Sequence, residues 1–310
     1  MLANPLYLLL LQVVFVLSWS SGFIGARLGT EDASAINLLF WRFLLVSLCL
    51  LPLVWHRLRA LSWAQVRYNA MIGFLAQFAY LVSVYIAIRG GLPAGIAAII
   101  CALQPLITAT MNSRGRHERS SVQEWLGLAV GFAGVSVVIL GEYRFSAQRL
   151  NLGLYALPLI AAFTLSIATL YQRRQSLLAT DHSKEGLLMP LFLQSAASLI
   201  LLMATGLPLG LIEVPRSSQV WVSVTWLTVF STFIAYLSLW SLLKWISATR
   251  VSALVYLEPP VTLIWATLMF SDVIQWTTYL GIGVVAAGTL ITRRRAKPGL
   301  ACTNQSSVDV

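Results

Sequence analysis

The sequence predicts an all-α membrane protein with ten transmembrane helices arranged as two inverted five-helix repeats. Three observations lead to this fold class: a composition poor in charge, ten long apolar runs, and an internal repeat. The 310 residues are 58% hydrophobic and 10% charged, with a mean hydropathy of +0.79. A soluble domain carries about 25% charged residues, so this chain must be solvated by lipid.

The ten apolar runs match the length of membrane-spanning helices, which need about 20 residues. They lie near residues 6–26, 34–54, 69–88, 92–111, 124–140, 152–171, 187–206, 219–243, 251–270 and 274–291. Each run is too long for a barrel strand, and a helix satisfies every backbone polar group within lipid. The first run lacks a basic flank and a convincing small-residue cleavage site, so no separate signal peptide is expected.

The basic residues indicate the orientation of the spans. Of the 21 Lys and Arg residues, 15 fall in one alternating set of connections and the C-terminal tail, 5 fall in the other set, and Arg42 lies within the second run. The positive-inside rule therefore places both termini in the cytoplasm. The net charge of +10 is a topology signal, and no nucleic-acid partner is expected.

An internal repeat appears when the chain is shifted against itself by 154 positions. The shift brings Leu103-Gln104-Pro105 onto Leu257-Glu258-Pro259 and Thr108 onto Thr262, without gaps. It also superposes an acid and two glycines: Glu118 on Asp272, Gly127 on Gly281, and Gly134 on Gly288. An offset larger by two brings Ala79-Tyr80-Leu81 onto Ala235-Tyr236-Leu237. These matches together indicate a duplication.

Each copy holds five spans, and this odd number predicts that the second copy enters the membrane upside down. The expected organisation is a first repeat over 1–141, a linker over 142–151, a second repeat over 152–292 and a cytoplasmic tail over 293–310. Inverted repeats recur in secondary transporters, which bind their substrates near the bilayer midplane between the two halves.

These motifs resemble the EamA-type branch of the drug/metabolite transporter superfamily over roughly residues 6–292. The resemblance is carried by Arg42-Phe43, by Pro105 and Pro259, and by an acid before the last helix of each unit. Glu118 matches that acid, and Asp272 replaces the usual glutamate. The last helices carry the matching glycines Gly127, Gly134, Gly281 and Gly288. The resemblance implies a carrier of amino acids, other metabolites or drugs, often an exporter, and it leaves the substrate open.

Glu258 is the foremost candidate site residue. A carboxylate inside a span costs about 2.5–3.5 kcal/mol on insertion scales, so it is expected to face a cavity, pair with a cation or be protonated. Thr262 and Trp265 follow at helical spacing on the same face. Pro259 and Pro260 remove two backbone donors and favour a local helix break. The alternative is a structural acid that extends to the cytoplasmic face.

Gln104 and Arg42 are the other polar candidates. Gln104 occupies the position of Glu258 in the first repeat, next to Pro105, and would contact substrate or form an interhelical hydrogen bond. Arg42 lies near mid-membrane and stays charged, so it needs a counter-charge, carbonyls or water. It would bind an anion or, the interpretation favoured here, act as a structural clamp.

Five aromatic residues lie inside spans and would suit an amphipathic organic substrate: Trp19, Tyr80, Tyr85, Tyr236 and Trp240. Ordinary helix packing is the alternative for each of them. The sequence indicates no cofactor and no metal ligand set. His56, His117 and His182 lie in connections, and no Gly-Lys pair forms a phosphate-binding loop.

The sequence thus predicts a secondary transporter of small organic metabolites that works by alternating access in the inner membrane of a bacterium. An uncoupled channel and a non-transport membrane protein of the same fold are the rival interpretations. A membrane-embedded enzyme is disfavoured, because Arg42 and Glu258 are the only clear charges within the spans. The expected partners are the solute and membrane lipid, and the sequence does not indicate a homodimer.

Overall fold

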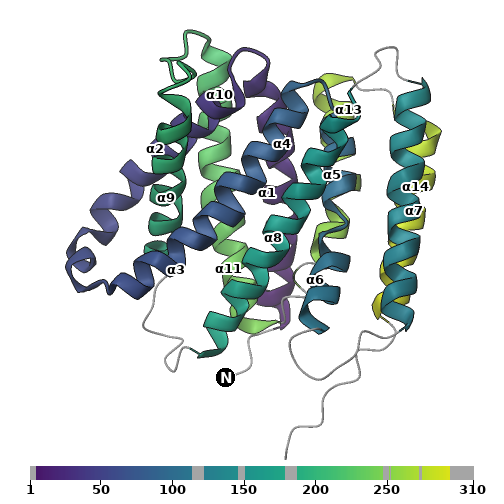
Figure 1. The fold of residues 1–310 in the computed structure, drawn as a ribbon, viewed down its shortest axis with the longest axis horizontal. Helices are drawn as coiled ribbons and strands as arrows, with labels where there is room; N and C mark the ends of the chain where they lie inside the picture. Colours follow the sequence, from purple (N-terminus) through teal and green to yellow (C-terminus); the bar gives the residue numbers. More distant parts are fainter. Residues whose placement is uncertain are drawn as a thin grey trace, which may run out of the picture.

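The computed structural model describes residues 5–113, 122–145, 151–178, 187–246, 251, 253–271 and 274–293. Within these residues, all regular secondary structure is helical, and most helices lie side by side in one bundle (Figure 1). The prediction of an all-helical chain is confirmed for the described part.

Six of the predicted runs contain a long uninterrupted α-helix. These are α1 (Pro5–Thr30), α2 (Ala35–Val54), α7 (Val122–Phe145), α8 (Gly153–Leu178), α9 (Leu188–Gly206) and α14 (Trp276–Arg293). A 3₁₀ segment, η1 (Trp55–Ala60), follows α2 and ends before α3. Ser62 then caps α3 through a reciprocal pair of hydrogen bonds with Gln65, which satisfies two backbone donors at the helix start.

The other four runs are interrupted. The third run consists of α3 (Trp63–Gly73), the π-helical η2 (Phe74–Ala79) and α4 (Tyr80–Arg89), and the eighth of α10 (Ser218–Trp226), the π-helical η3 (Leu227–Ile234) and α11 (Ala235–Trp245). The fourth run splits into α5 (Ala94–Cys101) and α6 (Gln104–Ser113), and the ninth into the 3₁₀ segment η4 (Ala253–Leu257) and α13 (Glu258–Phe270). The interruptions thus fall in runs that the sequence repeat places in correspondence.

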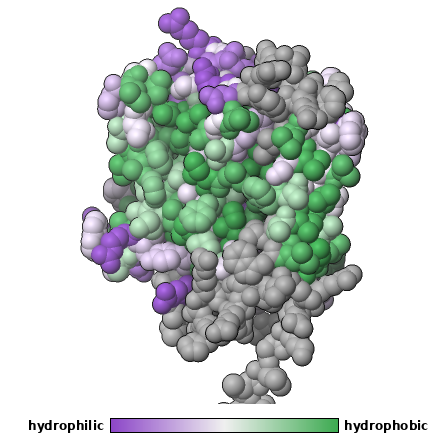
Figure 2. Space-filling view, turned by 45° about the vertical axis from the view of Figure 1, so that its right-hand side comes forward, coloured by the Kyte–Doolittle hydropathy of each residue, from purple (hydrophilic) through white to green (hydrophobic). Residues whose placement is uncertain are grey.

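The outer surface identifies a multi-pass membrane protein. Six helices of the described chain are long and apolar enough to cross a membrane: Pro5–Thr30, Ala35–Ala60, Trp63–Arg89, Gly153–Arg174, Leu188–Gly206 and Ser218–Trp245. Shorter apolar helices cover Ala94–Thr108, Ala129–Val138 and Leu254–Phe270. Figure 2 shows hydrophobic residues filling a broad central band, with hydrophilic residues toward the ends. The count of ten spans and their inverted arrangement stay predictions.

The bundle is held together by antiparallel helix pairs. α7 and α14 form one such pair at the edge of the bundle (Figure 1). A Cβ on Gly134 would lie 2.9 Å from the carbonyl oxygen of Gly281, and a Cβ on Gly288 would lie 2.7 Å from that of Gly127. The glycines therefore let the two backbones touch, as small residues do at membrane helix interfaces.

Several predicted features lie outside the described residues. They are Glu118, Asp272, His117, His182, residues 146–150 of the expected linker and the tail beyond Arg293, with which α14 ends. The expected division into two repeats, a linker and a tail therefore stays a prediction.

Candidate functional site

Four of the five aromatic side chains that the sequence singled out form one buried cluster. The ring centroid of Trp19 on α1 lies 5.9 Å from that of Tyr80 and 5.1 Å from that of Tyr236. Tyr236 in turn lies 5.9 Å from Trp240, and all four side chains are at most 5% exposed. The cluster joins α1 and α4 of the first half to α11 of the second. We refer to these four residues as the aromatic cluster.

Glu258 lies next to this cluster at the start of α13. Its side chain is 0% exposed, and neither carboxyl oxygen has a hydrogen-bond partner. The carboxyl interacts electrostatically with Tyr80 of the aromatic cluster and with Cys101 at the end of α5. A buried polar group without a partner is costly, so this carboxyl calls for a proton or a ligand.

The helix breaks at Glu258 and Gln104 lie at a similar depth. α13 packs along α5 while η4 packs near α6, so the two broken runs lie side by side in opposite directions. Glu258 and Gln104 are each the first residue of the helix after the break, and Pro105 and Pro259 follow them directly. Pro260 falls within the first turn of α13, where the missing N–H leaves no helical hydrogen bond unmade.

Two further polar atoms near these breaks also lack partners. The side chain of Gln104 is 3% exposed; its Nε2 is 3.4 Å from Oγ1 of Thr169, and its Oε1 is unpaired. Thr262 is one turn after Glu258, is 0% exposed and has an unpaired Oγ1. Trp265, expected on the same face, is half-buried, and its ring lies 6.4 Å from that of Trp226 rather than in the aromatic cluster.

All three side-chain nitrogens of Arg42 donate hydrogen bonds to other residues of the protein. Its Nε donates to Oγ1 of Thr232 at 2.8 Å, and its Nη1 donates to the hydroxyl of Tyr85 at 2.7 Å. Its Nη2 donates to the carbonyl oxygen of Ser231 at 3.0 Å. These bonds fasten α2 to α4 and to the π-helical η3. The geometry is that of a clamp between the two halves.

A polar network that the sequence analysis did not predict begins at Trp240 of the aromatic cluster. Nε1 of Trp240 donates to Oε1 of Gln194 at 3.1 Å, and Nε2 of Gln194 is 3.2 Å from Oδ1 of Asn69. The hydroxyl of Ser195 donates to Oε1 of Gln77 at 3.1 Å. The sequence feature that could have revealed this network is a glutamine within an apolar run in each half of the chain: Gln77 in the run 69–88 and Gln194 in the run 187–206.

The space beside the aromatic cluster is small. A cavity of about 20 Å³ is lined by three of the cluster residues, Trp19, Tyr80 and Tyr236, together with Tyr85 and Ser231 among others. This volume accommodates about one water molecule. The cavity that these three rings line is therefore too small for a metabolite.

Comparison with known proteins decides the family. The model of the EamA-like transporter family matches residues 6–140 and 152–294. The chain belongs to this family. A "Probable amino-acid metabolite efflux pump" of Escherichia coli (strain K12) is 26% identical over 296 residues, covering 91% of this chain and 93% of that protein. An "Uncharacterized inner membrane transporter YedA" of the same strain is 25% identical, covering 88% of this chain and 86% of that protein.

The fold has a solved counterpart. A crystal structure with 17% sequence identity superposes with a TM-score of 0.65 and covers 94% of this EamA-family chain and 100% of its own. At this identity the likeness concerns the fold alone. The family and the names of the relatives point to a transporter and not to an enzyme.

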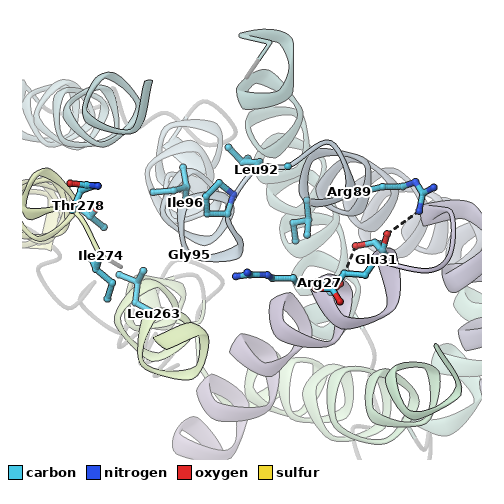
Figure 3. Close-up of a pocket in the computed structure, with 14 residues that line it drawn as sticks. Arg27, Glu31, Arg89, Leu92, Gly95, Ile96, Leu263, Ile274 and Thr278 are labelled. Atoms are coloured by element: carbon cyan, nitrogen blue, oxygen red, sulfur yellow. Dashed lines mark hydrogen bonds between the residues drawn. The ribbon is translucent and has the colours of Figure 1, made fainter. Parts of the chain in front are cut away.

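A second, larger cavity opens at the end of the molecule where α1 ends, opposite the end where α1 begins. Its volume is about 610 Å³, and it lies between the end of α1, the α4–α5 connection, α13 and α14 (Figure 3). Arg27, Arg89 and Glu31 lie on one side of it, and Leu263 and Ile274 on the other. The sequence analysis counted Arg27 and Arg89 only among the basic residues of the connections, because nothing in the sequence indicates that they line one cavity.

Proposed function

We propose that this EamA-family chain is a secondary active transporter that exports small organic metabolites by alternating access. The site would be the aromatic cluster with Glu258, Gln104 and Thr262, at the meeting of the two halves. Arg42 would act as a clamp beside it, and the prolines Pro105, Pro259 and Pro260 would maintain the helix breaks.

The observation that carries this proposal is the environment of Glu258. A fully buried carboxyl with two unpartnered oxygens is destabilising, so a purely structural role offers no compensation for it. A proton or the positively charged group of a solute would compensate it. The aromatic cluster, of which Tyr80 interacts with Glu258, would suit the apolar part of such a solute, and aromatic rings bind cations through their faces.

The contacts between α7 and α14 support the inverted-repeat architecture. The 154-residue offset carries Gly127 onto Gly281 and Gly134 onto Gly288. It therefore turns the contact between Gly134 and Gly281 into a contact between Gly288 and Gly127, and both contacts occur. Such reciprocity is expected of two halves related by a two-fold axis in the membrane plane.

The small cavity beside the aromatic cluster supports a carrier over a channel. About 20 Å³ cannot hold a metabolite, so a solute needs a different conformation to enter. The paired π-helical segments η2 and η3 are natural places for such a change, because π-helical turns occur frequently at functional sites.

The named relatives support export of metabolites and an inner-membrane location. One relative is named as a probable amino-acid metabolite efflux pump and another as an inner membrane transporter. Both relatives are matched over most of their length. The proposal therefore assigns to this chain the inner-membrane location that one name states and metabolites, as the other name states, as its solutes. The basic connections support the cytoplasmic placement of both termini.

Solute counterflow in proteoliposomes tests the proposal. Vesicles holding the purified chain are preloaded with amino acids and other small metabolites in turn, and uptake of the labelled solute is measured with and without a proton gradient. A carrier accelerates uptake when unlabelled solute is present on the opposite side. Uptake without such acceleration would identify a channel, and no uptake of any metabolite would contradict the proposal.

A further inference from the structure

Gln77 in η2 carries a buried hydrogen-bond donor that the folded chain does not use. Its side chain is 0% exposed, and its Oε1 accepts a hydrogen bond of 3.1 Å from the hydroxyl of Ser195 on α9. Its Nε2 has no hydrogen-bond partner within the part of the chain that the structure describes. A buried N–H group without a partner lowers stability, so this amide calls for a compensating ligand.

The amide of Gln77 lies at the edge of the aromatic cluster. The hydroxyl of Tyr236 donates to the carbonyl oxygen of Ala76, the residue that precedes Gln77. Nε1 of Trp240 donates at 3.1 Å to Oε1 of Gln194, the residue that precedes the serine bonded to the amide. Two rings of the cluster are therefore hydrogen-bonded to the immediate chain neighbours of this amide and of its partner.

The corresponding contact in the other half of the chain is satisfied. The 154-residue offset carries Gln77 onto Ser231 of η3, and Arg42 of α2 onto Ala196 of α9. Nη2 of Arg42 donates to the carbonyl oxygen of Ser231 at 3.0 Å and to its hydroxyl at 3.2 Å. An arginine thus bonds η3 to α2, whereas the contact between η2 and α9 retains an unpaired donor. This difference indicates that the donor of Gln77 serves a ligand rather than the packing of the two helices.

We propose that Gln77 is a specificity-determining residue of the solute site and donates a hydrogen bond from Nε2 to a carbonyl or carboxylate oxygen of the solute. This assignment rests on the proposed function, in which the aromatic cluster holds the apolar part of the solute and Glu258 its positive group. The solute class is then an amphipathic amine that carries such an oxygen. The π-helical geometry of η2 supports this role, because π-helical turns are frequent at functional sites.

The test compares two amines that share a ring and differ in the acceptor oxygen. Binding of 4-fluorophenylalaninamide, which has a carbonyl oxygen, and of 4-fluorophenethylamine, which has none, to the detergent-solubilised full chain is titrated by broadening of the fluorine NMR signal. We expect the native chain to bind the carboxamide more tightly than the simple amine. Gln77→Met keeps the length of the side chain without its donor. It should weaken carboxamide binding by about fivefold and leave binding of the simple amine unchanged, as expected for the loss of one neutral hydrogen bond.

A matched variant and the counterflow assay complete the test. Gln12→Met makes the same change at a partly exposed position of α1 outside the aromatic cluster, and it should bind both probes as the native chain does. Equal binding of the two probes, failure of both to bind, an unchanged preference in Gln77→Met or an equal loss in Gln12→Met overturns the role of Gln77. Any of these results together with metabolite counterflow overturns that role alone. A preference for the carboxamide that Gln77→Met abolishes, in a chain without counterflow, overturns the proposed transport alone.

Discussion

The Nε of Arg42 and the Oγ1 of Thr232 lie 2.8 Å apart, so a charge in the second span is bonded directly to the π-helical segment of the eighth. The same guanidinium bonds Tyr85 and Ser231. Because Arg42 is 0% exposed, these neutral groups and the guanidinium satisfy one another away from water. The contact joins α2 of the first half to the π-helical η3 of the second.

Replacing Arg42 should therefore destabilise the chain. Arg42→Met keeps much of the side-chain length but leaves the Tyr85 and Thr232 hydroxyls without this donor. A hydrogen bond to a charged group contributes about 1.5–3 kcal/mol, so we expect a clear fall in the unfolding temperature of the detergent-solubilised protein. Arg59→Met, at an exposed position, is the control. Equal unfolding temperatures for the two variants would contradict the clamp.

The interface between α7 and α14 should be sensitive to a single methyl group. In Gly288→Ala the new Cβ would meet the backbone of Gly127, and overpacking of this kind costs about 1–3 kcal/mol. A Cβ added to Gly283, on the same helix, would have nothing within 4 Å, so Gly283→Ala should be tolerated. Thermal unfolding of both variants checks this expectation. A Gly288 variant as stable as the Gly283 variant would show that the helices do not pack this closely.

The sequence predicted those features whose cause is local. Apolar runs, prolines and an isolated carboxylate are visible in the chain itself, and the helix breaks before Pro105 and Pro259 follow from them. The all-helical membrane class, and four of the aromatic residues that form the cluster, could therefore be named in advance. Trp265 was grouped with Glu258 by helical spacing alone, and that spacing does not reveal that Trp226 of another helix packs against it.

Features that depend on distant partners could not be predicted. Arg42 meets residues about 190 positions away, and no pattern in the sequence pairs them. The hydrogen bond between Gln77 and Ser195 likewise joins two halves of the chain. The larger cavity forms between the end of α1, the α4–α5 connection, α13 and α14, which meet only in the folded chain.

The orientation of the chain can be tested with two single cysteines. In a variant lacking the native cysteines, Glu213→Cys and Arg59→Cys both replace exposed side chains. The positive-inside rule predicts that residue 213 lies outside and that residue 59 lies in the cytoplasm. A membrane-impermeant maleimide added to intact cells should label the first and leave the second unlabelled until the cells are opened. The reverse labelling pattern would contradict cytoplasmic termini.

The aromatic cluster should determine affinity for the transported solute. Trp19→Ala removes a ring that contacts both Tyr80 and Tyr236, so the solute concentration for half-maximal counterflow should rise by about tenfold, the effect of losing one aromatic contact with its buried area. The corresponding concentration for Trp19→Phe, which keeps a ring, should rise less. Trp63→Ala, which alters a side chain that is 75% exposed, is the control. A native half-maximal concentration for Trp19→Ala would exclude the cluster from binding.

The most direct test of the central claim is counterflow by Glu258→Gln across a range of pH. The glutamine keeps the size of the side chain but can neither bind a proton nor carry the charge that a solute cation would need. We predict that transport is lost, or that its dependence on pH disappears, in protein that remains folded and inserted. Glu213→Gln, which neutralises an exposed acid, should keep the native rate and the native pH profile. Native transport with a native pH profile in Glu258→Gln would contradict the proposed role of this carboxyl.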